Sequence, residues 1–449
     1  MSELCSVGID VGTTTTQLIL SRLTVENRAS AFTVPELVIG KREVRYRSPV
    51  YFTPLLGKDQ VDGQQLRLLV EQEYERAGVR REDVDTGAVI ITGETSRKEN
   101  ARAVLKALEG FAGDFVAATA GPDLESVLAA RGAGAVDFSA ENGKRVLHMD
   151  IGGGTSNLAW IEDGKIVKTG CLNVGGRLIK FSKDRKITYV SPVLNGICDW
   201  SIGDSMTEER AEAIAKTLVQ ALEMAAGLRE VTPLLEKLWT GEAGQRWALK
   251  PVESVFSFSG GVADCIENRP DWCEYGDIGP VLGRMIRRSR LCGGEFRLGE
   301  ETIRATVIGA GCHSVQLSGS TVFHRGVAFP LKNKPVVCLP GDCSAAELAE
   351  RLRMLDEDGV LALPEEVPPG YERLKELAKR IVGGFGERPI LVAVEADVAK
   401  ALGQLMALES EGPVLCIDRV RLAEGSYLDI GTPVGTALPV VVKTLILER

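Results

Sequence analysis

The stretch DIGGGTSNLAWIED, residues 150–163, decides the fold expected for this chain. It continues an apolar strand expected over 145–150, turns through three glycines and returns as a second strand over 157–161. Asp163 and Gly164 follow as a strong hairpin-turn signal. Three consecutive glycines lose much backbone entropy on folding, so a purely structural turn is a poor explanation for them.

A second stretch of the same design, DVGTTTTQLILSRL, lies at residues 10–23. Each stretch has an acid that ends a strand, then a Gly-rich turn with Thr, then another strand. Here the strands are expected over 5–10 and 16–23, which makes a hairpin rather than a strand–helix–strand unit. Because short apolar runs then alternate with helical patterns, the two stretches predict a duplicated α/β architecture.

Both turns are expected to bind phosphate oxygens, because glycine permits close backbone approach and successive N–H groups form an anion nest. Mg²⁺ prefers one or two carboxylates together with water and phosphate oxygens. Asp10 and Asp150 are therefore the candidate catalytic and Mg²⁺-holding residues, on two tips that would clamp a triphosphate across a cleft. The candidate binding residues in the turns are Gly12, Thr13, Thr14, Thr15, Gly152, Gly153, Gly154, Thr155 and Ser156. Taken alone, the first turn is also compatible with an ordinary structural feature.

A third block, FSFSGGVAD over 256–264, runs from an apolar strand into a small-residue turn and an apparent helix. Its glycines would let a base or ribose lie against the backbone, and the helix dipole would favour a phosphate. The block is equally compatible with a structural turn. Neither hairpin matches GxxxxGK[ST], and no GxGxxG opens a helix after a strand, which excludes the usual P-loop and dinucleotide sites. The candidates in this block are Ser259, Gly260, Gly261 and Val262.

Charged residues in the segment ITGETSRKENAR, 91–102, have two interpretations each. Glu94 follows an expected strand and would orient or deprotonate the attacking water, or it is an acid that favours a helix N-terminus. Lys98 would neutralise phosphate charge, or it lies on a solvated helix face. With Arg97 and Arg102 it would alternatively form a patch that faces a partner. His148, two residues before Asp150, is expected to be a buried structural histidine.

Composition excludes several classes of protein. With 44% hydrophobic and 26% charged residues the chain is soluble and globular. A net charge of -9, from 53 basic and 62 acidic residues, argues against a general nucleic-acid binder. The ten cysteines show neither CxxC nor zinc-site spacing, as in reduced cytosolic proteins. The apolar runs fall well short of the ~20 residues of a membrane helix, and no secretory signal opens the chain. We therefore expect a cytoplasmic protein that binds neither nucleic acid nor membrane.

Three domains are expected from the length of the chain and from the positions of its turn-forming and proline residues. Residues 1–147 form the first nucleotide-binding lobe. Residues 148–330 form the second lobe, with a helical insertion over 181–250. Frequent prolines from 335 onward mark a small C-terminal α/β domain at 331–449.

Taken in order, the three blocks resemble the phosphate-1, phosphate-2 and adenosine motifs of the actin, Hsp70 and sugar-kinase superfamily, over about residues 5–320. The resemblance implies two ribonuclease-H-like lobes that close on ATP and Mg²⁺. It also implies that the small-residue segment 308–311 belongs to a helix at which the lobes hinge.

The whole chain is similar to the family of ethanolamine ammonia-lyase reactivating factors. The similarity is carried by GIDVGTTTTQLILSRL (8–23), ITGETSRKENAR (91–102), HMDIGGGTSNLAWIEDG (148–164), IRATVIGAGCHSVQLSGST (303–321), YLDIGTPVG (427–435) and VVVKTLIL (440–447). This family implies a chaperone that uses ATP binding and hydrolysis to release damaged cobalamin from ethanolamine ammonia-lyase, so that intact coenzyme enters. An association with a bacterial microcompartment is implied by the family alone.

Two other functions stay open at this level, because one nucleotide-binding fold serves many activities. A metabolite kinase of the same fold would need a carboxylate base in the second lobe, where Asp199 and Asp204 are candidates. An actin-like protein would use nucleotide to time its assembly. The absence of a long alternating β pattern after the lobes favours a dedicated partner over general unfolded chains.

Overall fold

The computed structural model describes most of the chain in two compact units. Unit 1 combines Met1–Ile91, Lys98–Thr119 and Ala310–Arg449, and unit 2 combines Thr92–Arg97 and Ala120–Gly309. The described residues are 2–12, 15–27, 37–56, 60–92, 104, 108, 116–119, 122–240, 254–313, 315–318, 322–353, 358–363, 370–420, 422, 426–433 and 438–444.

The N-terminal part of unit 1 is a mixed sheet with the order β3-β2-β1-β7-β8. Strands β1 and β2 form the predicted antiparallel hairpin, and β1 also pairs in parallel with β7. Helix α1 begins where the Asp62 carboxylate accepts two backbone amides and ends at Gly78, which has a φ of 66°. The elements are β1 (Ser2–Val11), β2 (Thr15–Asn27), β3 (Leu37–Arg47), β4 (Tyr51–Phe52), β5 (Leu55–Leu56), β6 (Gln60–Val61), α1 (Gly63–Ala77), η1 (Arg81–Asp83), β7 (Thr86–Ile91) and β8 (Val116–Thr119).

Unit 2 repeats this order, strand for strand, as β11-β10-β9-β14-β15. Strands β9 and β10 form the second predicted hairpin, and β9 pairs in parallel with β14, as β1 does with β7. The turn between β10 and β11 holds Asp163 and Gly164 at φ values of 48° and 72°, as a tight hairpin requires. The repeated order makes the predicted duplication visible as topology.

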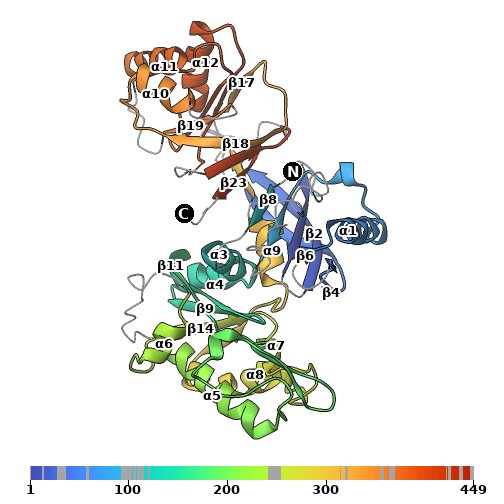
Figure 1. The fold of residues 1–449 in the computed structure, drawn as a ribbon. Helices are drawn as coiled ribbons and strands as arrows, with labels where there is room; N and C mark the ends of the chain where they lie inside the picture. The colour runs from blue at the N-terminus through green and yellow to red at the C-terminus, as the bar shows by residue number, and fades with distance from the viewer. Residues whose placement is uncertain are drawn as a thin grey trace. The chain divides into compact units, whose positions relative to one another are not determined.

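Helices complete unit 2 around its sheet. Helices α3 and α4 pack beside β9, β10 and β11 (Figure 1). Helix α5 begins at the cap Thr207 and buries one apolar face in the main core of the unit. The elements are α3 (Pro122–Gly132), α4 (Ala135–Asn142), β9 (Val146–Ile151), β10 (Ser156–Glu162), β11 (Lys165–Leu172), β12 (Ile179–Phe181), β13 (Ile187–Val190), η3 (Pro192–Leu194), α5 (Glu208–Ala225), α6 (Pro233–Leu238), β14 (Val255–Ser259), α7 (Asp264–Asn268), α8 (Gly279–Arg287), η5 (Arg290–Cys292) and β15 (Phe296–Leu298).

The C-terminal part of unit 1 is built on an eight-stranded sheet, β16-β23-β22-β18-β19-β20-β21-β17. Side chains of its parallel strands alternate between two apolar clusters, one of which includes residues of α10, α11 and α12. The elements are β16 (Val315–Ser318), β17 (Phe323–Arg325), β18 (Leu331–Cys338), α10 (Ala345–Arg353), β19 (Val360–Leu363), α11 (Tyr371–Phe385), β20 (Ile390–Val394), α12 (Ala399–Glu409), β21 (Val414–Ile417), β22 (Ser426–Ile430) and β23 (Leu438–Thr444).

The sequence predicts both hairpins and several of the helices, but it does not predict β3, β18, α4, α8 or α12. The sequence also predicts a helix over 97–109, and this segment lies outside the described residues except at positions 104 and 108. Helices α3 and α4 belong to unit 2 although they precede residue 148. The three-domain division at 147 and 330 stays a prediction.

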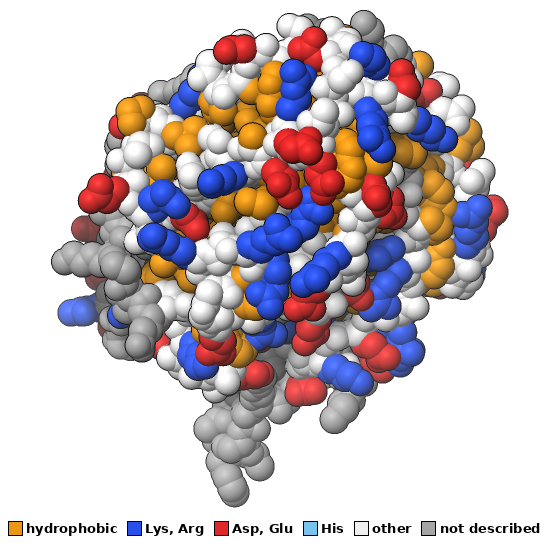
Figure 2. Space-filling view, turned by 90° about the horizontal axis from the view of Figure 1, so that it is seen from below, with side chains coloured by type: hydrophobic (Ala, Val, Ile, Leu, Met, Phe, Trp, Pro, Cys, Tyr) orange, Lys and Arg blue, Asp and Glu red, His pale blue; other side chains and the backbone are white. Residues whose placement is uncertain are grey.

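The surface and the thiols agree with the composition. One face of the molecule interleaves acidic and basic side chains (Figure 2). Nine of the ten cysteines have described side chains, and all nine are free thiols. Among the described residues, no helix is both long enough and apolar enough to cross a membrane.

Helix α9 (Ala305–His313) connects the two units and approaches its neighbours through glycine. In unit 2 a β-carbon at Gly309 would overlap the backbone carbonyl of Leu128 in α3. In unit 1 a β-carbon at Gly311 would lie 3.0 Å from the backbone nitrogen of Gly8 in β1. Because Gly309 has room only for a hydrogen and Gly311 leaves little room for more, the backbone of α9 packs closely against α3 and β1.

Replacing Gly309 by alanine tests this packing. Alanine favours a helix over glycine by about 1 kcal/mol, but the overlap with Leu128 forces a shift that typically costs 1–3 kcal/mol. Gly309→Ala is therefore expected to lower the midpoint of denaturant unfolding. The matched control is Gly383→Ala in α11, where the nearest neighbour atom would be 3.5 Å away. That variant should be as stable as the wild type or more so, and equal behaviour of the two variants would contradict the packing argument.

Candidate functional site

Equivalent backbone hydrogen bonds close the two predicted turns. In unit 1 the amide of Gly12 donates to the carbonyl of Thr15, at 2.9 Å. In unit 2 the amide of Gly152 donates to the carbonyl of Thr155, also at 2.9 Å. The acids occupy equivalent places, because Asp10 pairs with Gln17 and Asp150 with Asn157 in their hairpins. The repeat seen in the sequence therefore extends to the atoms that shape the turns.

The unit 1 turn is fixed from outside by a threonine. The Thr53 hydroxyl donates to the carbonyl of Gly12 at 2.8 Å and lies 3.1 Å from the Thr16 hydroxyl. Asp10 is half-buried near the end of β1, and Thr15 is half-buried at the start of β2. The candidates Thr13 and Thr14 lie outside the described residues.

The unit 2 turn has two backbone amides without an acceptor among the described residues. The carbonyls of Gly152 and Gly153 accept the amides of Gly176 and Arg177, at 3.0 and 2.6 Å. The amides of Gly153 and Gly154 have no hydrogen-bond acceptor among the described residues, and both glycines are exposed. Two adjacent unpaired amides at a glycine turn have the form of an anion-binding nest.

The two side chains that follow the glycines differ in burial. Thr155 is half-buried, whereas Ser156 is buried. The buried Ser156 hydroxyl donates to the carbonyl of Val174 at 2.7 Å, so it holds the neighbouring segment in place. Within the candidate set, the backbone of residues 152–154 is therefore better placed for a ligand than the Ser156 side chain.

The third block packs against the end of β9, within the same unit. Gly260 has a φ of 85°, and a β-carbon there would overlap the backbone of Ile151. The amide of Val262 donates to the carbonyl of Ile151 at 3.1 Å. Unit 2 thus brings 150–154 and 259–262 together. Gly261 is exposed, whereas the Val262 side chain is buried in the core and contributes only backbone here.

A chain of buried polar side chains leads to Asp150. His148 is paired with Ser257 across β9 and β14, and Asp150 with Ser259. The ring of His148 contacts Ser257 through Nδ1 at 3.0 Å and Ser259 through Nε2 at 2.9 Å. The Ser259 hydroxyl donates to Asp150 Oδ1 at 2.5 Å, and the Thr306 hydroxyl lies 3.5 Å from Oδ2.

The direction of these hydrogen bonds assigns the proton on the imidazole. Since the Ser259 hydroxyl gives its one hydrogen to the carboxylate, it accepts from His148 Nε2–H. Burial and the positive charge of Arg297 lower the pKa of His148 from 6.5 to about 3, so the ring is neutral. Burial raises the pKa of Asp150 to about 6, against the opposing effect of hydrogen bonds from Ser259 and Thr306.

The remaining candidates are placed as follows. Glu94, Arg97, Lys98 and Arg102 lie outside the described residues. The carboxylate of Asp204 accepts the amide of Ser201 at 3.0 Å and closes a local turn. The described residues contain no cluster of three or more His, Cys, Asp or Glu side chains suited to a metal ion.

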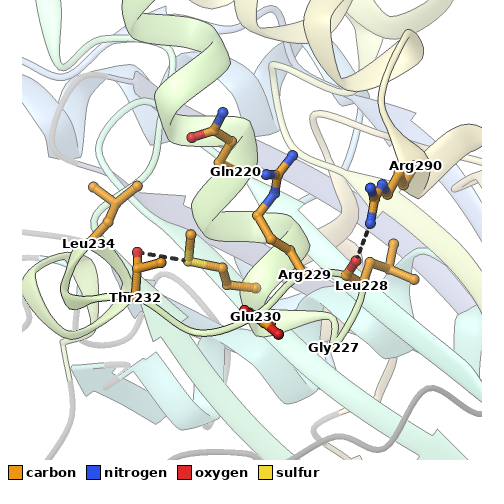
Figure 3. Close-up of a pocket in the computed structure, with 9 residues that line it drawn as sticks. Gln220, Gly227, Leu228, Arg229, Glu230, Thr232, Leu234 and Arg290 are labelled. Atoms are coloured by element: carbon orange, nitrogen blue, oxygen red, sulfur yellow. Dashed lines mark hydrogen bonds between the residues drawn. The ribbon is translucent and has the colours of Figure 1, made fainter.

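A separate hollow of about 680 Å³ lies at the C-terminal end of α5 (Figure 3). It is lined by Gln220, Met224, Gly227, Leu228, Arg229, Glu230, Thr232, Leu234 and Arg290. None of these is a predicted site residue. The Arg290 guanidinium donates to the carbonyl of Leu228 at 2.7 Å, which ties one wall of the hollow together.

The comparisons with known proteins agree over almost the whole chain. The model of the family described as "Ethanolamine utilisation protein EutA" matches residues 2–448. The chain belongs to this family. Two relatives named "Ethanolamine ammonia-lyase reactivase EutA" are similar: the Salmonella typhimurium protein is 40% identical and the Escherichia coli protein 39%. Each alignment covers 99% of this chain and 98% of the relative.

Solved structures match over a smaller part of the chain. A Ppx/GppA family protein of Aquifex aeolicus aligns with 69% of this chain and 97% of its own, at 12% identity and a TM-score of 0.40.

In this EutA-family chain the sequence missed several residues that support the site. Ser257 and Thr306 near Asp150, Thr53 beside the first turn, and Arg177 beside the second were not singled out. A signal for Ser257 was present in the sequence. His148 and Asp150 are two residues apart on one strand, and Ser257 and Ser259 are two residues apart on another. Such spacing puts each pair on one face of its strand, but only the register of β9 with β14 joins them.

The buried polar chain is tested by His148→Leu. The variant leaves the Ser257 hydroxyl without its ring partner, and an unpaired buried polar group typically costs about 1–3 kcal/mol. We expect that loss in denaturant unfolding at pH 8. The double variant His148→Leu/Ser257→Ala should recover part of it, because both polar partners are then gone.

The stability difference should also depend on pH. With a folded pKa of about 3 and an ordinary value of 6.5 for His148, the unfolded wild type takes up a proton first as the pH falls. His148 therefore lowers the stability of the wild type between pH 6.5 and 3, by on the order of 1 kcal/mol per pH unit, whereas the raised pKa of Asp150 acts in both proteins. The leucine variant has no such loss, so the gap between the two proteins should narrow from pH 8 to pH 5. A constant gap would show that His148 is not held neutral.

Proposed function

We propose that this chain is an ATP-dependent reactivase of ethanolamine ammonia-lyase. In this activity, ATP binding and hydrolysis drive release of damaged cobalamin, so that intact adenosylcobalamin binds the lyase. Membership of the EutA family and 40% identity to a relative named as this reactivase support the partner. The observation that supports nucleotide use is the pair of equivalent turns, each with an acid at the strand end and the same closing hydrogen bond.

The phosphates are proposed to bind the backbone of the two turns. In unit 2 the open amides of Gly153 and Gly154 suit phosphate oxygens. Residues 259–261 beside them are proposed to contact the adenosine, because glycine leaves room for a flat group at the backbone. In unit 1 the same task falls to residues 12–15.

Asp10 and Asp150 are proposed to hold Mg²⁺, mainly through water. The residues of unit 2 fit this role: Asp150 keeps its carboxylate oriented by Ser259 and Thr306, as an outer-sphere ligand requires. Bound Mg²⁺ would neutralise charge on the phosphates. Few protein ligands are needed for such an ion, since Mg²⁺ retains several waters and binds substrate phosphates.

Glu94 is proposed to orient the attacking water, and Lys98 to offset phosphate charge. We place the reaction in the cytoplasm, with the bacterial microcompartment association that the family suggests.

The proposal is tested by reactivation of inactivated lyase. Ethanolamine ammonia-lyase carrying hydroxocobalamin is mixed with this protein, Mg²⁺, ATP and fresh adenosylcobalamin, while lyase activity and cobalamin release are followed. Activity should return with ATP and not without it. Asp10→Asn and Asp150→Asn should each lower both ATP hydrolysis and reactivation about 10- to 100-fold, as the loss of metal-orienting groups does.

Asp184→Asn serves as the control, because Asp184 lies at an exposed turn, where its carboxylate accepts a hydrogen bond from the Ser182 hydroxyl. It should retain full activity. Hydrolysis of ATP without any effect on the lyase would contradict the assignment of the lyase as the partner. Consumption of ATP only with a small-molecule acceptor would support a kinase instead, and nucleotide-dependent light scattering would support an assembly protein.

A further inference from the structure

Arg177 lies directly against the glycine turn of unit 2. Its amide donates to the carbonyl of Gly153, at 2.6 Å, and the segment before it bonds to Gly152. Its side chain covers the same glycine: a β-carbon at Gly153 would lie 3.3 Å from Cδ of Arg177. A positive side chain therefore starts at, and runs along, the turn whose amides are open.

The guanidinium is held from one side only. Its Nε lies 3.2 Å from Oδ2 of Asp277, and Oδ1 of the same buried carboxylate accepts the amide of Gly279 at 2.8 Å. Burial raises the pKa of Asp277, while the Gly279 amide and Arg177 act to lower it. The side chain of Arg177 remains 32% exposed, and only its Nε has a hydrogen-bond acceptor among the described residues.

Unit 2 holds a second arginine whose Nε is paired with a buried carboxylate that also accepts a backbone amide, and this clamp lies away from the turn. Nε of Arg229 lies 2.9 Å from Oε2 of the buried Glu223, whose Oε1 accepts the amide of Arg290 at 3.1 Å. Arg229 is 38% exposed, close to the value for Arg177. It lines the hollow of Figure 3 rather than a glycine turn. The clamp by itself is thus a structural device, and the position of Arg177 is what distinguishes it.

We propose that Arg177 is a phosphate-binding residue, whose terminal nitrogens contact the polyphosphate of a nucleotide seated on Gly152–Gly154. This inference rests on the proposed nucleotide site. A guanidinium offers paired N–H donors that match two phosphate oxygens. Because Asp277 fixes the Nε edge, the terminal donors are oriented before the nucleotide binds, which lowers the entropy cost of binding. The charge also offsets the repulsion between the phosphates and the Asp150 carboxylate.

The test is nucleotide affinity by calorimetry with ATP and with adenosine, in the presence of Mg²⁺. A lost charge-assisted hydrogen bond costs about 1.5–3 kcal/mol, so Arg177→Gln should weaken ATP binding by about 10- to 100-fold. Adenosine carries no phosphate, and its affinity should stay within about twofold. Arg177→Lys should recover part of the ATP affinity, because lysine restores the charge without the paired donors.

Arg229→Gln is the matched control. Both glutamine variants leave a buried carboxylate without its ion-pair partner, so both should melt at lower temperature. Only Arg177→Gln should lose ATP affinity selectively over adenosine. The double variant Arg177→Gln/Asp277→Asn removes the unpaired carboxylate and should regain stability without regaining ATP affinity.

The outcomes separate this inference from the proposed function. If the wild type binds ATP and Arg177→Gln binds it equally well, the role of Arg177 is overturned and the proposed function stands. Return of ATP affinity in the double variant would likewise assign Arg177 a purely structural role. Failure of the wild type to bind ATP would overturn both.

Discussion

The register between β9 and β14 is the constraint on which the candidate site depends. Asp150 is 9% exposed, and a carboxylate removed from water needs hydrogen-bond donors close by. The register supplies them, because it sets Ser259 opposite Asp150 and Ser257 opposite His148. A slip of β14 by one residue would turn Ser257 and Ser259 to the face of the sheet opposite His148 and Asp150. The polar chain and the strand pairing therefore specify each other.

Close backbone packing around the end of β9 has a second effect. The third block approaches Ile151 from one side, and the segment 175–177 lies along Gly152 and Gly153. Both approaches depend on glycine, at Gly260 and at Gly175, where a β-carbon would overlap neighbouring backbone. The carbonyls of Gly152 and Gly153 accept hydrogen bonds in this packing, while the amides of Gly153 and Gly154 have no acceptor among the described residues. The backbone alone thereby presents two adjacent donors, which suits an anion.

The sequence was sufficient for the two hairpins, their turns and the duplication, because these follow from local patterns. Apolar strands, glycine clusters and terminal acids are legible in order, and the duplication follows from comparing residues 10–23 with 150–163. The side chains that hold the site residues in place could not be predicted from the sequence. Asp277 is one hundred residues from Arg177 along the chain, and Ser257 is 109 residues from His148. Such pairs are created by tertiary packing, and no periodicity or spacing within one segment reports them.

The connection of the chain has a consequence for how the molecule is made. Unit 2 is one nearly continuous stretch, whereas unit 1 is assembled from segments at both ends of the sequence. Strand β16, which follows α9, pairs with β23, the last described strand. During synthesis, unit 2 has all its residues outside the ribosome while β16 still lacks its partner. The usual order, in which the N-terminal part finishes first, is therefore inverted, and the first unit to begin is the last to be completed.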